Sequence, residues 1–385
     1  MRFPEFSGEW NKYTINDLAT VVGGGTPDTT VKSYWGGDIQ WFTPSEIGKN
    51  KYVDFSKRTI TRDGLDNSSA KLLPLHTILL SSRATVGECS IASNECTTNQ
   101  GFQSLIAKQC NIDFLYYLIQ TKKKDLIRNA CGSTFLEISA NEIRKIKVAV
   151  PVQNEQEQIA KLLSLIDERI ATQNKIIEKL QSLIKGLVDE LMTVLLKGKL
   201  YPFSSFYIKA GEGGTPTTSV VEYYTEGTIP FIKIEDLSCK YLTNNKDFIT
   251  ELGMQKSSAW LIPSKSVIYS NGATIGAISI NEYPVCTKQG ILGIVPNTNI
   301  NVEYLYLLMS SSYFSKEISR IITEGTMKTA YLKDINHIKC PLPSMAQQKN
   351  ITNLTSSIEE KLSIEQELLR FLNLQKQYLL RMMFI

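Results

Sequence analysis

The sequence predicts an α+β protein: two tandem copies of one α/β domain, separated by a long antiparallel two-helix coiled coil. Two observations carry this prediction. Short motifs recur at a nearly constant distance along the chain, and each copy ends in a long segment with a heptad pattern of apolar residues. The 385 residues exceed the roughly 100–200 of an ordinary domain, so two or three domains are expected. Hydrophobic residues make up 42% and charged residues 21%, a balance that argues against a disordered chain.

The duplication is visible in short identical or similar segments. Gly24–Pro27 and Gly213–Pro216 both read Gly-Gly-Thr-Pro, an offset of 213 − 24 = 189 residues. Ala84–Gly87 and Ala273–Gly276 differ at one residue and keep this offset, and later matches stay close to it. Chance rarely produces so many scattered matches at one offset. A period of this length describes a full domain and not a solenoid repeat.

Within each copy, roughly the first 150 residues are rich in Gly, Ser, Thr and β-branched residues in short alternating runs, which predicts strands. In the first copy the expected elements are strands at Ile39–Phe42, Thr77–Ser81, Cys89–Ala92 and Lys145–Val150 and a helix at Phe114–Ile127. In the second copy they are strands at Ile229–Ile232, Ser266–Ser270, Ala277–Ile280 and Ile338–Pro341 and a helix at Val302–Ile321.

The segment that follows each of these regions has a helical pattern. In the first copy, apolar residues alternate four and three positions apart from Ile159 to Val194, with Gln173 as the polar interruption. The second copy repeats the pattern more weakly, with Glu365 as its polar interruption. Both segments are therefore expected to form a coiled-coil seam, in which a polar position commonly fixes the register.

These patterns divide the chain into four segments. Residues 1–152 and 199–343 form the two globular domains, and residues 153–198 and 344–385 form the two helices. Only a short link joins the first helix to the second domain, so the second helix must run back along the first to pack on it. The helices are therefore expected to be antiparallel, with the domains at opposite ends of a spacer about 64 Å long.

Composition argues against several classes of function. The net charge of +4 permits an anionic partner without requiring one. No apolar run approaches the roughly 18 residues of a membrane span, and the first residues lack the apolar core of a signal peptide. We therefore expect a cytoplasmic protein with no membrane attachment. Seven cysteines without a Cys-x-x-Cys pair, and only two histidines, argue against a metal site and a histidine-based active site.

Polar and basic loop residues remain as candidates for contact with nucleic acid. Arginine and lysine can bridge guanine edges, asparagine and glutamine can pair with adenine, and lysine also suits phosphates. Taken singly, each of these residues is more often a solvated loop residue, whereas Tyr34 and Trp35 are expected to pack in the core. Equivalent loop positions differ between the copies: Arg83 matches Gly272, so one scaffold would read two different sequences. The candidates are Lys32, Thr43, Ser45, Glu46, Ser82, Arg83, Asn99, Gln100, Lys123, Ser133, Thr134, Lys233, Glu235, Ser270, Asn271, Lys288, Gln289, Thr326 and Lys328.

Several motifs together resemble those of one protein family. The chain opens with Phe-Pro-Glu-Phe-x-Gly-Glu-Trp at residues 3–10 and carries the Gly-Gly-Thr-Pro loop in each half. It enters the first helix with Pro-Val-Gln-Asn-Glu-Gln-Glu-Gln-Ile at Pro151–Ile159, which is echoed at Pro343–Ile351. From end to end the chain resembles the specificity subunit of type I restriction–modification systems. The helix-entry motif is fairly specific to that family.

The resemblance implies that each globular domain is a target recognition domain. Together the two would read a bipartite, asymmetric sequence in double-stranded DNA, with the helices as the spacer that sets its gap. The implied partners are two methyltransferase (modification) subunits and the restriction (motor–nuclease) subunits. These partners use S-adenosylmethionine, ATP and magnesium, whereas this chain would bind no cofactor and hold no catalytic residue. In the second copy Glu155-Gln156 becomes Gln347-Gln348, which puts the docking of the second methyltransferase subunit in question.

Two other functions stay open from the sequence. A methyltransferase with fused recognition domains would explain the duplicated domains, but the chain lacks the Asp-Pro-Pro-Tyr or Asn-Pro-Pro-Tyr motif of amino-methyltransferases. A coiled-coil scaffold protein would explain the helices but not the repeated, loop-rich domains.

Overall fold

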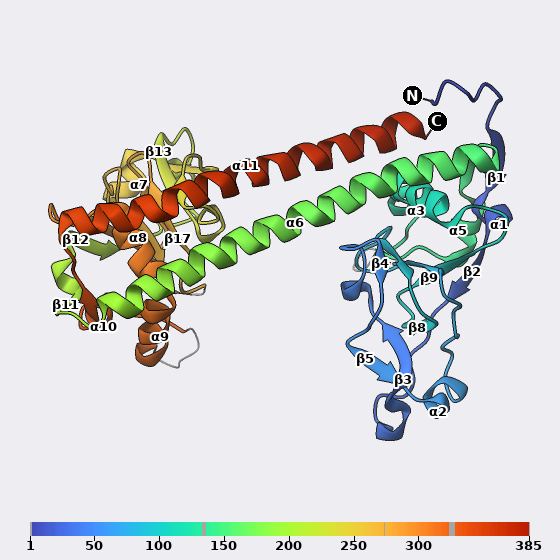
Figure 1. Ribbon diagram of the computed structural model, residues 1–385, viewed down its shortest axis with the longest axis horizontal. Helices are drawn as coiled ribbons and strands as arrows, with labels where there is room; N and C mark the ends of the chain where they lie inside the picture. Colours follow the sequence, from blue (N-terminus) through green and yellow to red (C-terminus); the bar gives the residue numbers. More distant parts are fainter. Residues whose placement is uncertain (1, 133–135, 273, 323–327, 385) are drawn as a thin grey trace. The chain divides into compact units, whose positions relative to one another are not determined.

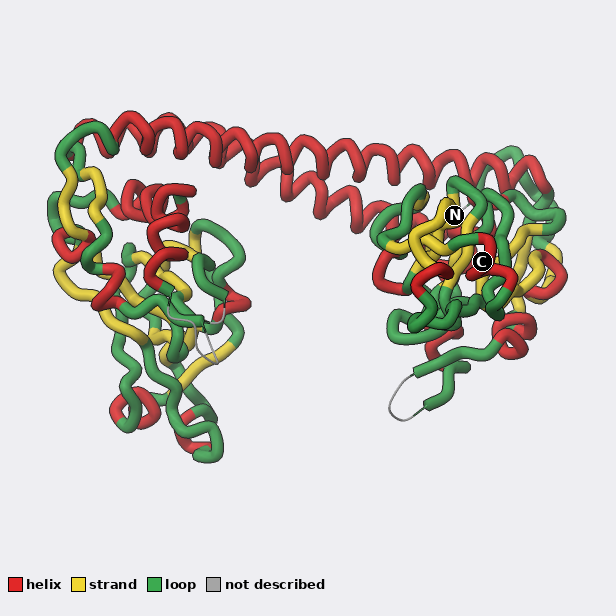
Figure 2. Tube along the Cα trace, turned by 90° about the horizontal axis from the view of Figure 1, so that it is seen from below, coloured by secondary structure: helices red, strands yellow, loops and turns green. Residues whose placement is uncertain are grey.

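The computed structural model describes residues 2–132, 136–272, 274–322 and 328–384. The chain divides into two compact units, Met1–Lys175 with Glu367–Ile385 and Ile176–Gln366. Both long helices are shared between the units, whereas the division drawn from the sequence gave each helix a segment of its own. Each unit is therefore a globular domain together with a piece of each long helix. Figure 1 colours the elements along the sequence, and Figure 2 colours them by type.

The elements of the first globular domain follow in chain order. The strands are β1 (Asn11–Thr14), β2 (Ala19–Gly23), β3 (Trp35–Phe42), β4 (Tyr52–Val53), β5 (Arg58–Ile60), β6 (Ile78–Leu80), β7 (Cys89–Ala92), β8 (Cys96–Thr98), β9 (Gln103–Ala107) and β10 (Lys147–Val150). The helices are α1 (Ile15–Leu18), α2 (Arg62–Asp66), α3 (Ile112–Thr121), α4 (Lys123–Arg128) and α5 (Ala140–Lys145), with 3-10 turns η1 (Lys32–Tyr34) and η2 (Pro44–Glu46). The long helix α6 (Gln153–Leu195) leaves this domain after β10.

The second globular domain repeats this order. Its strands are β11 (Leu200–Pro202), β12 (Tyr207–Glu212), β13 (Ile229–Ile232), β14 (Tyr241–Leu242), β15 (Asp247–Ile249), β16 (Val267–Ser270), β17 (Ile278–Asn281), β18 (Cys286–Thr287), β19 (Ile291–Pro296) and β20 (Lys339–Pro341). Its helices are α7 (Glu251–Gln255), α8 (Val302–Ser310), α9 (Ser312–Ile321) and α10 (Leu332–Ile335), with 3-10 turns η3 (Phe203–Ser205), η4 (Val221–Tyr223) and η5 (Ile234–Asp236). The long helix α11 (Met345–Met383) follows β20.

The strand topology of the two units is the same. The first unit has a five-stranded sheet in the order β2-β9-β6-β7-β4, a three-stranded sheet β5-β3-β8 and a β1-β10 pair. The second unit has β12-β19-β16-β17-β14, β15-β13-β18 and β11-β20. The parallel pairings also match, because β3–β8 corresponds to β13–β18 and β4–β7 to β14–β17. The predicted duplication of an α+β domain is confirmed strand by strand.

The predicted local elements are largely found, with one kind of error. The strands at Cys89–Ala92 and Ile229–Ile232 have the predicted bounds. The single helices predicted at Phe114–Ile127 and Val302–Ile321 are wrong, because each is broken into two. At the second break Ser311 is extended, and its hydroxyl accepts from the backbone of the next helix as an N-cap. A local serine cap thus interrupts an apolar pattern that continues across it.

The long helices pack antiparallel, as predicted. In the first unit Leu379, near the end of α11, shares a buried cluster with Ile159 and Leu163, near the start of α6. In the second unit Ile351, near the start of α11, shares a cluster with Met192, near the end of α6. In both units these helix residues belong to the main core beneath the five-stranded sheet, so the helices are part of each domain's core.

The predicted heptad seam holds at the start of α6 and drifts at its end. The polar seam residues Gln173 and Glu365 are both buried. Near the end of α6, however, Val188 and Met192 are buried, while the predicted seam residue Val194 is 62% exposed. In a straight helix of 3.6 residues per turn, the residues of a 3.5-residue repeat rotate gradually around the helix axis. Near the end of α6 the face that packs into the core of the second domain is therefore the one that carries Val188 and Met192.

Candidate nucleic-acid interface

The Gly-Gly-Thr-Pro loop of each unit packs against the end of the strand β8 or β18. A Cβ atom on Gly24 would lie 2.0 Å from the carbonyl oxygen of Asn99. One on Gly213 would lie 2.1 Å from the carbonyl oxygen of Thr287. Only glycine allows the two backbones to approach this closely. The repeated motif is therefore a structural joint that places the neighbouring loops.

Several of the predicted contact residues already have partners inside their own domain. The backbone N–H and hydroxyl of Thr43 donate to Glu46 Oε2 at 2.8 and 2.6 Å, and the Lys57 N–H donates to Glu46 Oε1 at 2.6 Å. Glu46 is thus a cap for its turn and has little free acceptor capacity. The other members of this group are Arg83 with Glu137 at 2.8 Å, Lys123 with Glu88, Lys233 with Asp247 at 2.8 Å, Asn99 with the Gly101 N–H at 2.9 Å, and Gln100 with Thr26.

Three predicted contact residues are buried: Ser82, its counterpart Asn271 in the second unit, and the neighbouring Ser270. The amide of Asn271 donates to the Ala330 carbonyl at 3.1 Å, which ties a later segment to this position. Ser82 Oγ, Ser270 Oγ and Asn271 Oδ1 have no hydrogen-bond partner among the described residues, which is unusual for buried polar atoms. A base contact by these residues would require the segments that cover them to move.

The remaining predicted contacts lie on the surface or outside the described residues. The exposed ones are Lys32, Ser45, Glu235, Lys288, Gln289 and Lys328. Ser133, Thr134 and Thr326 lie outside the described residues. The exposed side chains are open to a ligand and stay predictions as DNA contacts.

Arg58 is a candidate that the sequence patterns did not reveal. Its guanidinium carbon lies 3.6 Å from the ring centroid of Trp35 and 5.5 Å from that of Trp41. The two rings meet edge to face with their centroids 5.0 Å apart. Trp35, expected in the core, is only partly buried and supports this arginine. Comparison of the copies could have flagged the position, because its counterpart in β15 is Asp247.

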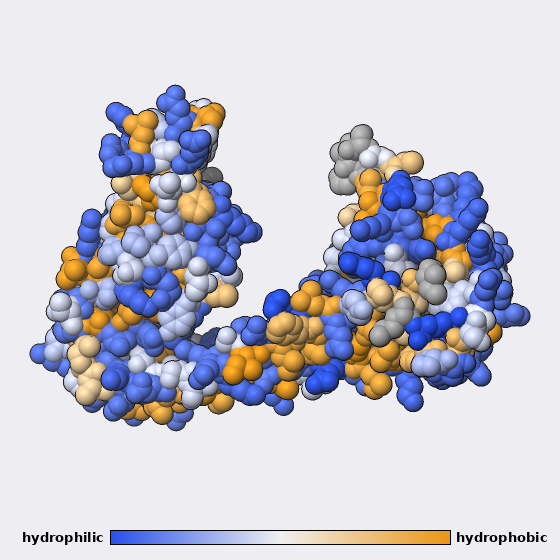
Figure 3. Space-filling view, turned by 90° about the horizontal axis from the view of Figure 1, so that it is seen from above, coloured by the Kyte–Doolittle hydropathy of each residue, from blue (hydrophilic) through white to orange (hydrophobic). Residues whose placement is uncertain are grey.

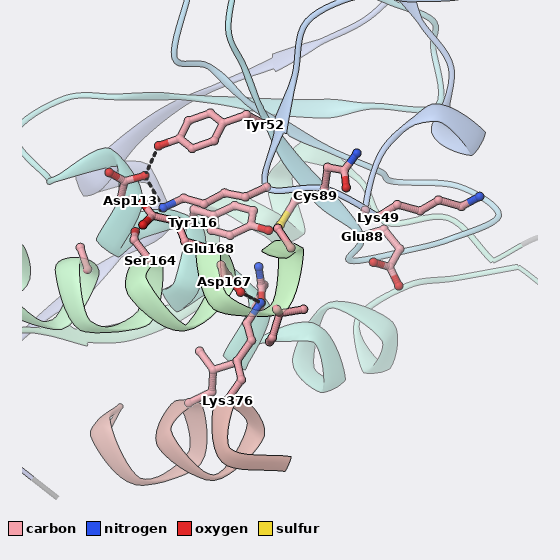
Figure 4. A pocket seen from close by; sticks show the side chains of 18 of the residues that line it. Lys49, Tyr52, Glu88, Cys89, Asp113, Tyr116, Ser164, Asp167, Glu168 and Lys376 are labelled. Atoms are coloured by element: carbon pink, nitrogen blue, oxygen red, sulfur yellow. Dashed lines mark hydrogen bonds and ion pairs between the residues drawn. The ribbon is translucent and has the colours of Figure 1, made fainter. Parts of the chain in front are cut away.

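A buried lysine fastens the first globular domain to α6. Lys51 Nζ lies 2.7 Å from Asp113 Oδ1 and donates to Ser164 Oγ at 2.6 Å, and its side chain is only 9% exposed. The hydroxyl of Tyr52 donates to the same Asp113 oxygen at 2.8 Å. These groups line a pocket of about 990 Å³ at the junction of the domain with the helix, where Figure 4 shows Tyr52 pointing to Asp113. The contacts fix how the domain sits on α6.

The helix α11 joins the same pocket from its other side (Figure 4). Lys376 Nζ lies 2.7 Å from Asp167 Oδ1, and the Tyr117 hydroxyl donates to Asp167 Oδ2 at 2.7 Å. Burial raises the pKa of Tyr117, and of Tyr52 nearby, well above the usual range, so both hydroxyls stay protonated donors. Asp167 is therefore held by partners from a domain helix and from α11.

A lysine of the second unit makes equivalent contacts. Lys240, which matches Lys51 at the offset of 189, pairs with Glu303 at 3.7 Å and closely with Glu359 of α11. The Tyr241 hydroxyl donates to Glu303 Oε1 at 2.7 Å, as Tyr52 does to its carboxylate. In each unit a lysine thus bridges an acidic residue at the start of a domain helix and a polar residue of a long helix.

The glutamine of the helix-entry motif ties each long helix to its own domain. Gln156 Oε1 accepts from the Asn111 N–H at 3.0 Å, while its amide donates to the Pro151 carbonyl at 2.9 Å. Gln348 repeats both contacts: it accepts from Asn301 at 2.7 Å and donates to the Pro343 carbonyl at 2.9 Å. Glutamine suits this place because its amide is donor and acceptor at once.

The residue before this glutamine differs between the copies for a local reason. Glu155 is fully buried and accepts two hydrogen bonds of 2.6 Å from the guanidinium of Arg2. Trp10 Nε1 adds a third at 3.3 Å. Its counterpart Gln347 is exposed and accepts from the Ser344 N–H at 3.0 Å. The departure from the motif therefore changes a contact within the chain, and its effect on the docking of the second methyltransferase subunit stays a prediction.

Two searches of the described residues gave negative results. No group of three or more His, Cys, Asp or Glu side chains there could hold a metal ion. No helix in the described ranges has both the length and the apolar character needed to cross a bilayer.

Comparison with known proteins gives consistent matches over the whole chain. The family described as type I restriction modification DNA specificity domain matches residues 7–182 and 206–373. The type I restriction enzyme MjaIX specificity subunit of Methanocaldococcus jannaschii is 29% identical over 382 residues, covering 92% of this chain and 88% of that protein. The crystal structure of the type I restriction–modification S subunit from M. genitalium aligns with a TM-score of 0.55 at 18% identity, covering 100% and 99% of the two chains. A structure from work on complex assembly and conformational transition of the type I R-M system aligns with a TM-score of 0.59 at 13% identity, over 98% of both chains. At these identities the two structures show a shared fold.

Proposed function

The chain belongs to the family of type I restriction–modification DNA specificity proteins, and on this premise we propose that it reads a bipartite, asymmetric sequence in double-stranded DNA. One DNA specificity domain matches in each half of the chain. The chain is therefore the non-catalytic DNA-recognition subunit of its complex. In the proposal each globular domain reads one half-site.

One observation carries the proposal of two different half-sites. The two units share one strand topology, yet equivalent surface positions carry different chemistry. Ser45 corresponds to Glu235, and both are exposed. Arg58 corresponds to Asp247, which reverses the charge. Because donors, acceptors and charges select between base edges, one scaffold with two sets of surface residues would recognise two different sequences.

We further propose that α6 and α11 set the gap between the half-sites and dock two methyltransferase subunits. Exposed apolar residues follow one another three or four positions apart near the end of α11, so they share a face of the helix. In Figure 3 apolar residues gather on the helices outside the globular domains. A contiguous apolar surface of this kind is typical of a site for a protein partner. The residues are Leu368, Phe371, Leu374, Tyr378 and Met382.

The proposal assigns all covalent chemistry to the partner subunits. The methyltransferase subunits would use S-adenosylmethionine, and the restriction (motor–nuclease) subunits would use ATP and magnesium. This chain would bind none of these cofactors. Because the complex acts on the DNA of the cell, we propose that the chain is cytoplasmic.

Mapping DNA methylation in a host genome tests the proposal. The chain is expressed with its methyltransferase partner, and methylated adenines are then located. We expect modified sites that share two fixed half-sites at a constant gap, and no modification when either component is expressed alone. A contiguous recognition sequence would contradict two separate readers. Methylation by this chain without the partner would contradict its role as a recognition subunit.

A further inference from the structure

The first unit contains a rigid aromatic support at its surface. The indole N–H of Trp35 donates to the Asp28 carbonyl at 3.1 Å, and that of Trp41 donates to the Gly25 carbonyl at 2.9 Å. Gly25 belongs to the Gly-Gly-Thr-Pro loop, and Asp28 is the residue just after it. The loop therefore locks both rings in place, at right angles to one another.

Arg58 lies on this support with its guanidinium against the Trp35 ring. It begins the short strand β5 opposite Trp41 and is exposed. Within the described residues its guanidinium contacts aromatic rings and has no hydrogen-bond or ion-pair partner. By contrast, Arg62 is paired with Asp66 at 3.2 Å in the same domain. The support thus holds a cation in a fixed orientation without neutralising it.

The second unit keeps the aromatic anchor but removes the cation. Tyr224 stands where Trp35 does, and its hydroxyl donates to the Pro216 carbonyl of the second Gly-Gly-Thr-Pro loop at 2.5 Å. At the position of Arg58 the second unit has Asp247, which is paired with Lys233 at 2.8 Å. A requirement of the fold would act on both copies alike. The exposed arginine without an ion-pair partner among the described residues is therefore found in the first unit and not at the equivalent position of the second. A residue that reads one of two different half-sites is expected to differ between the copies in this way.

We propose that Arg58 reads a guanine in the half-site bound by the first unit. The inference rests on the proposed function and adds a specificity-determining residue to it. A planar guanidinium can donate two parallel hydrogen bonds to guanine O6 and N7 in the major groove, and stacking fixes the plane from which they point. A phosphate contact needs only a positive charge, which lysine supplies without an aromatic support.

The test compares charge-retaining and charge-removing variants within the full chain bound to its methyltransferase partner. Selection from a randomised duplex library first gives both half-sites of the unaltered complex. Binding of Arg58→Lys, Arg58→Gln and the matched control Arg62→Gln is then measured on the selected duplex. The same measurement is made on duplexes with each guanine of the first half-site replaced in turn. Native-state hydrogen exchange of residues 11–107 confirms that each variant is folded.

We expect both Arg58 variants to lose discrimination at one guanine of the first half-site by roughly 5- to 150-fold. Discrimination in the second half-site and the binding of Arg62→Gln should not change. If Arg58→Lys keeps its discrimination while Arg58→Gln weakens all sequences alike and lowers the salt dependence by about one ion, Arg58 contacts a phosphate and the inference is overturned. Unaltered discrimination in both variants would also overturn it. Failure of the unaltered complex to select any sequence would instead overturn the proposed function, and the inference with it.

Discussion

Replacing Lys51 by methionine should loosen the first globular domain from α6 without unfolding the second unit. Lys51 bridges Asp113 at the start of α3 and Ser164 of α6, at 2.7 and 2.6 Å. Methionine has a similar length and fills the same space, but it supplies neither the charge nor the donor. Among the described residues, Asp113 would keep the hydrogen bond from the Tyr52 hydroxyl.

The size of the effect follows from the burial of the pair. Removing one partner of a buried ion pair costs about 3–5 kcal/mol, because the other charge is left uncompensated. The side chain of Asp113 is 28% exposed, so water restores part of this loss. The lost hydrogen bond to Ser164 adds about 1 kcal/mol. We therefore expect Lys51→Met to reduce the stability of the first unit by about 2–3 kcal/mol.

Native-state hydrogen exchange can locate this change along a single helix. Amides of α6 before Lys175 belong to the first unit and should exchange roughly 30- to 140-fold faster, while those from Ile176 onward should not change. A double-mutant cycle with Asp113→Asn should give a coupling energy of about 1–2 kcal/mol. Lys240→Met is the equivalent change in the second unit, where the bridged long helix is α11. Amides of α11 up to Gln366 should then exchange faster, while those from Glu367 onward should not change.

Lys145→Met serves as the matched control. Lys145 pairs with Glu142 at 2.9 Å, but its side chain is 71% exposed. Exposed pairs contribute about 0–1 kcal/mol, so hydrogen exchange in α6 should be unchanged. Equal protection of α6 in Lys51→Met and in this control would refute the reasoning. So would strictly additive effects of the Lys51 and Asp113 changes, since the pair would then carry no coupling.

Four further predictions follow from the helices and the cores. Inserting seven residues into each long helix keeps the heptad register and lengthens the helix by about 10 Å. The gap between the two half-sites in the DNA target should then grow by roughly three base pairs. A map of methylated sites with the original gap would contradict the spacer role. Iodoacetamide should label the exposed Cys131 and Cys239 of the folded chain, seen by mass spectrometry, because the other five thiols are buried. Burial raises the pKa to about 12 for Cys89, Cys96, Cys110 and Cys340 and to about 11 for Cys286. The protonated thiols stabilise the fold at pH values below the unfolded pKa of about 8.5, and this contribution is lost as the pH rises from there toward 12. The Tm should therefore fall above pH ~9. A Tm that does not change with pH in this range would argue against burial of these thiols. Gln156→Leu should lower the stability of the first unit by about 2–3 kcal/mol in urea unfolding followed by tryptophan fluorescence, because the part-buried Asn111 N–H and the buried Pro151 carbonyl lose their partner. The change Gln153→Leu at an exposed position should have little effect.

The architecture was predictable because its signals are either local or repeated. Matching motifs such as Gly24–Pro27 and Gly213–Pro216 reveal the duplication in the sequence. The two units have the same strand topology, as a duplication predicts. The strand at Cys89–Ala92 has the predicted bounds, and all four of its residues are buried in the sheet. The break at Ser311 was missed because a hydroxyl that caps a helix competes with an apolar pattern that runs through it.

The candidate site was less predictable because it depends on contacts between distant residues. Ser82 and Asn271 are polar residue types that are common in loops, but both are buried and bonded through their backbones to segments that are distant in the sequence. The role of Lys51 depends on Ser164, which lies 113 residues away along the chain. The stacking of Arg58 depends on two tryptophans whose orientation is set by a third segment. No periodicity in the sequence records such contacts.

The duplicate inside the chain provides a comparison that separates structure from recognition. Lys51 and Lys240 make the same kind of bridge to a long helix, and Gln156 and Gln348 make the same helix-entry contacts. Each of these retained side chains bonds within its own unit and holds a domain on the helices. Arg58, by contrast, is exposed, and its counterpart has the opposite charge. Two readers carried by one spacer must be held in equivalent ways while their half-sites differ. Residues that change between the copies and face solvent are therefore the first places to look for base contacts.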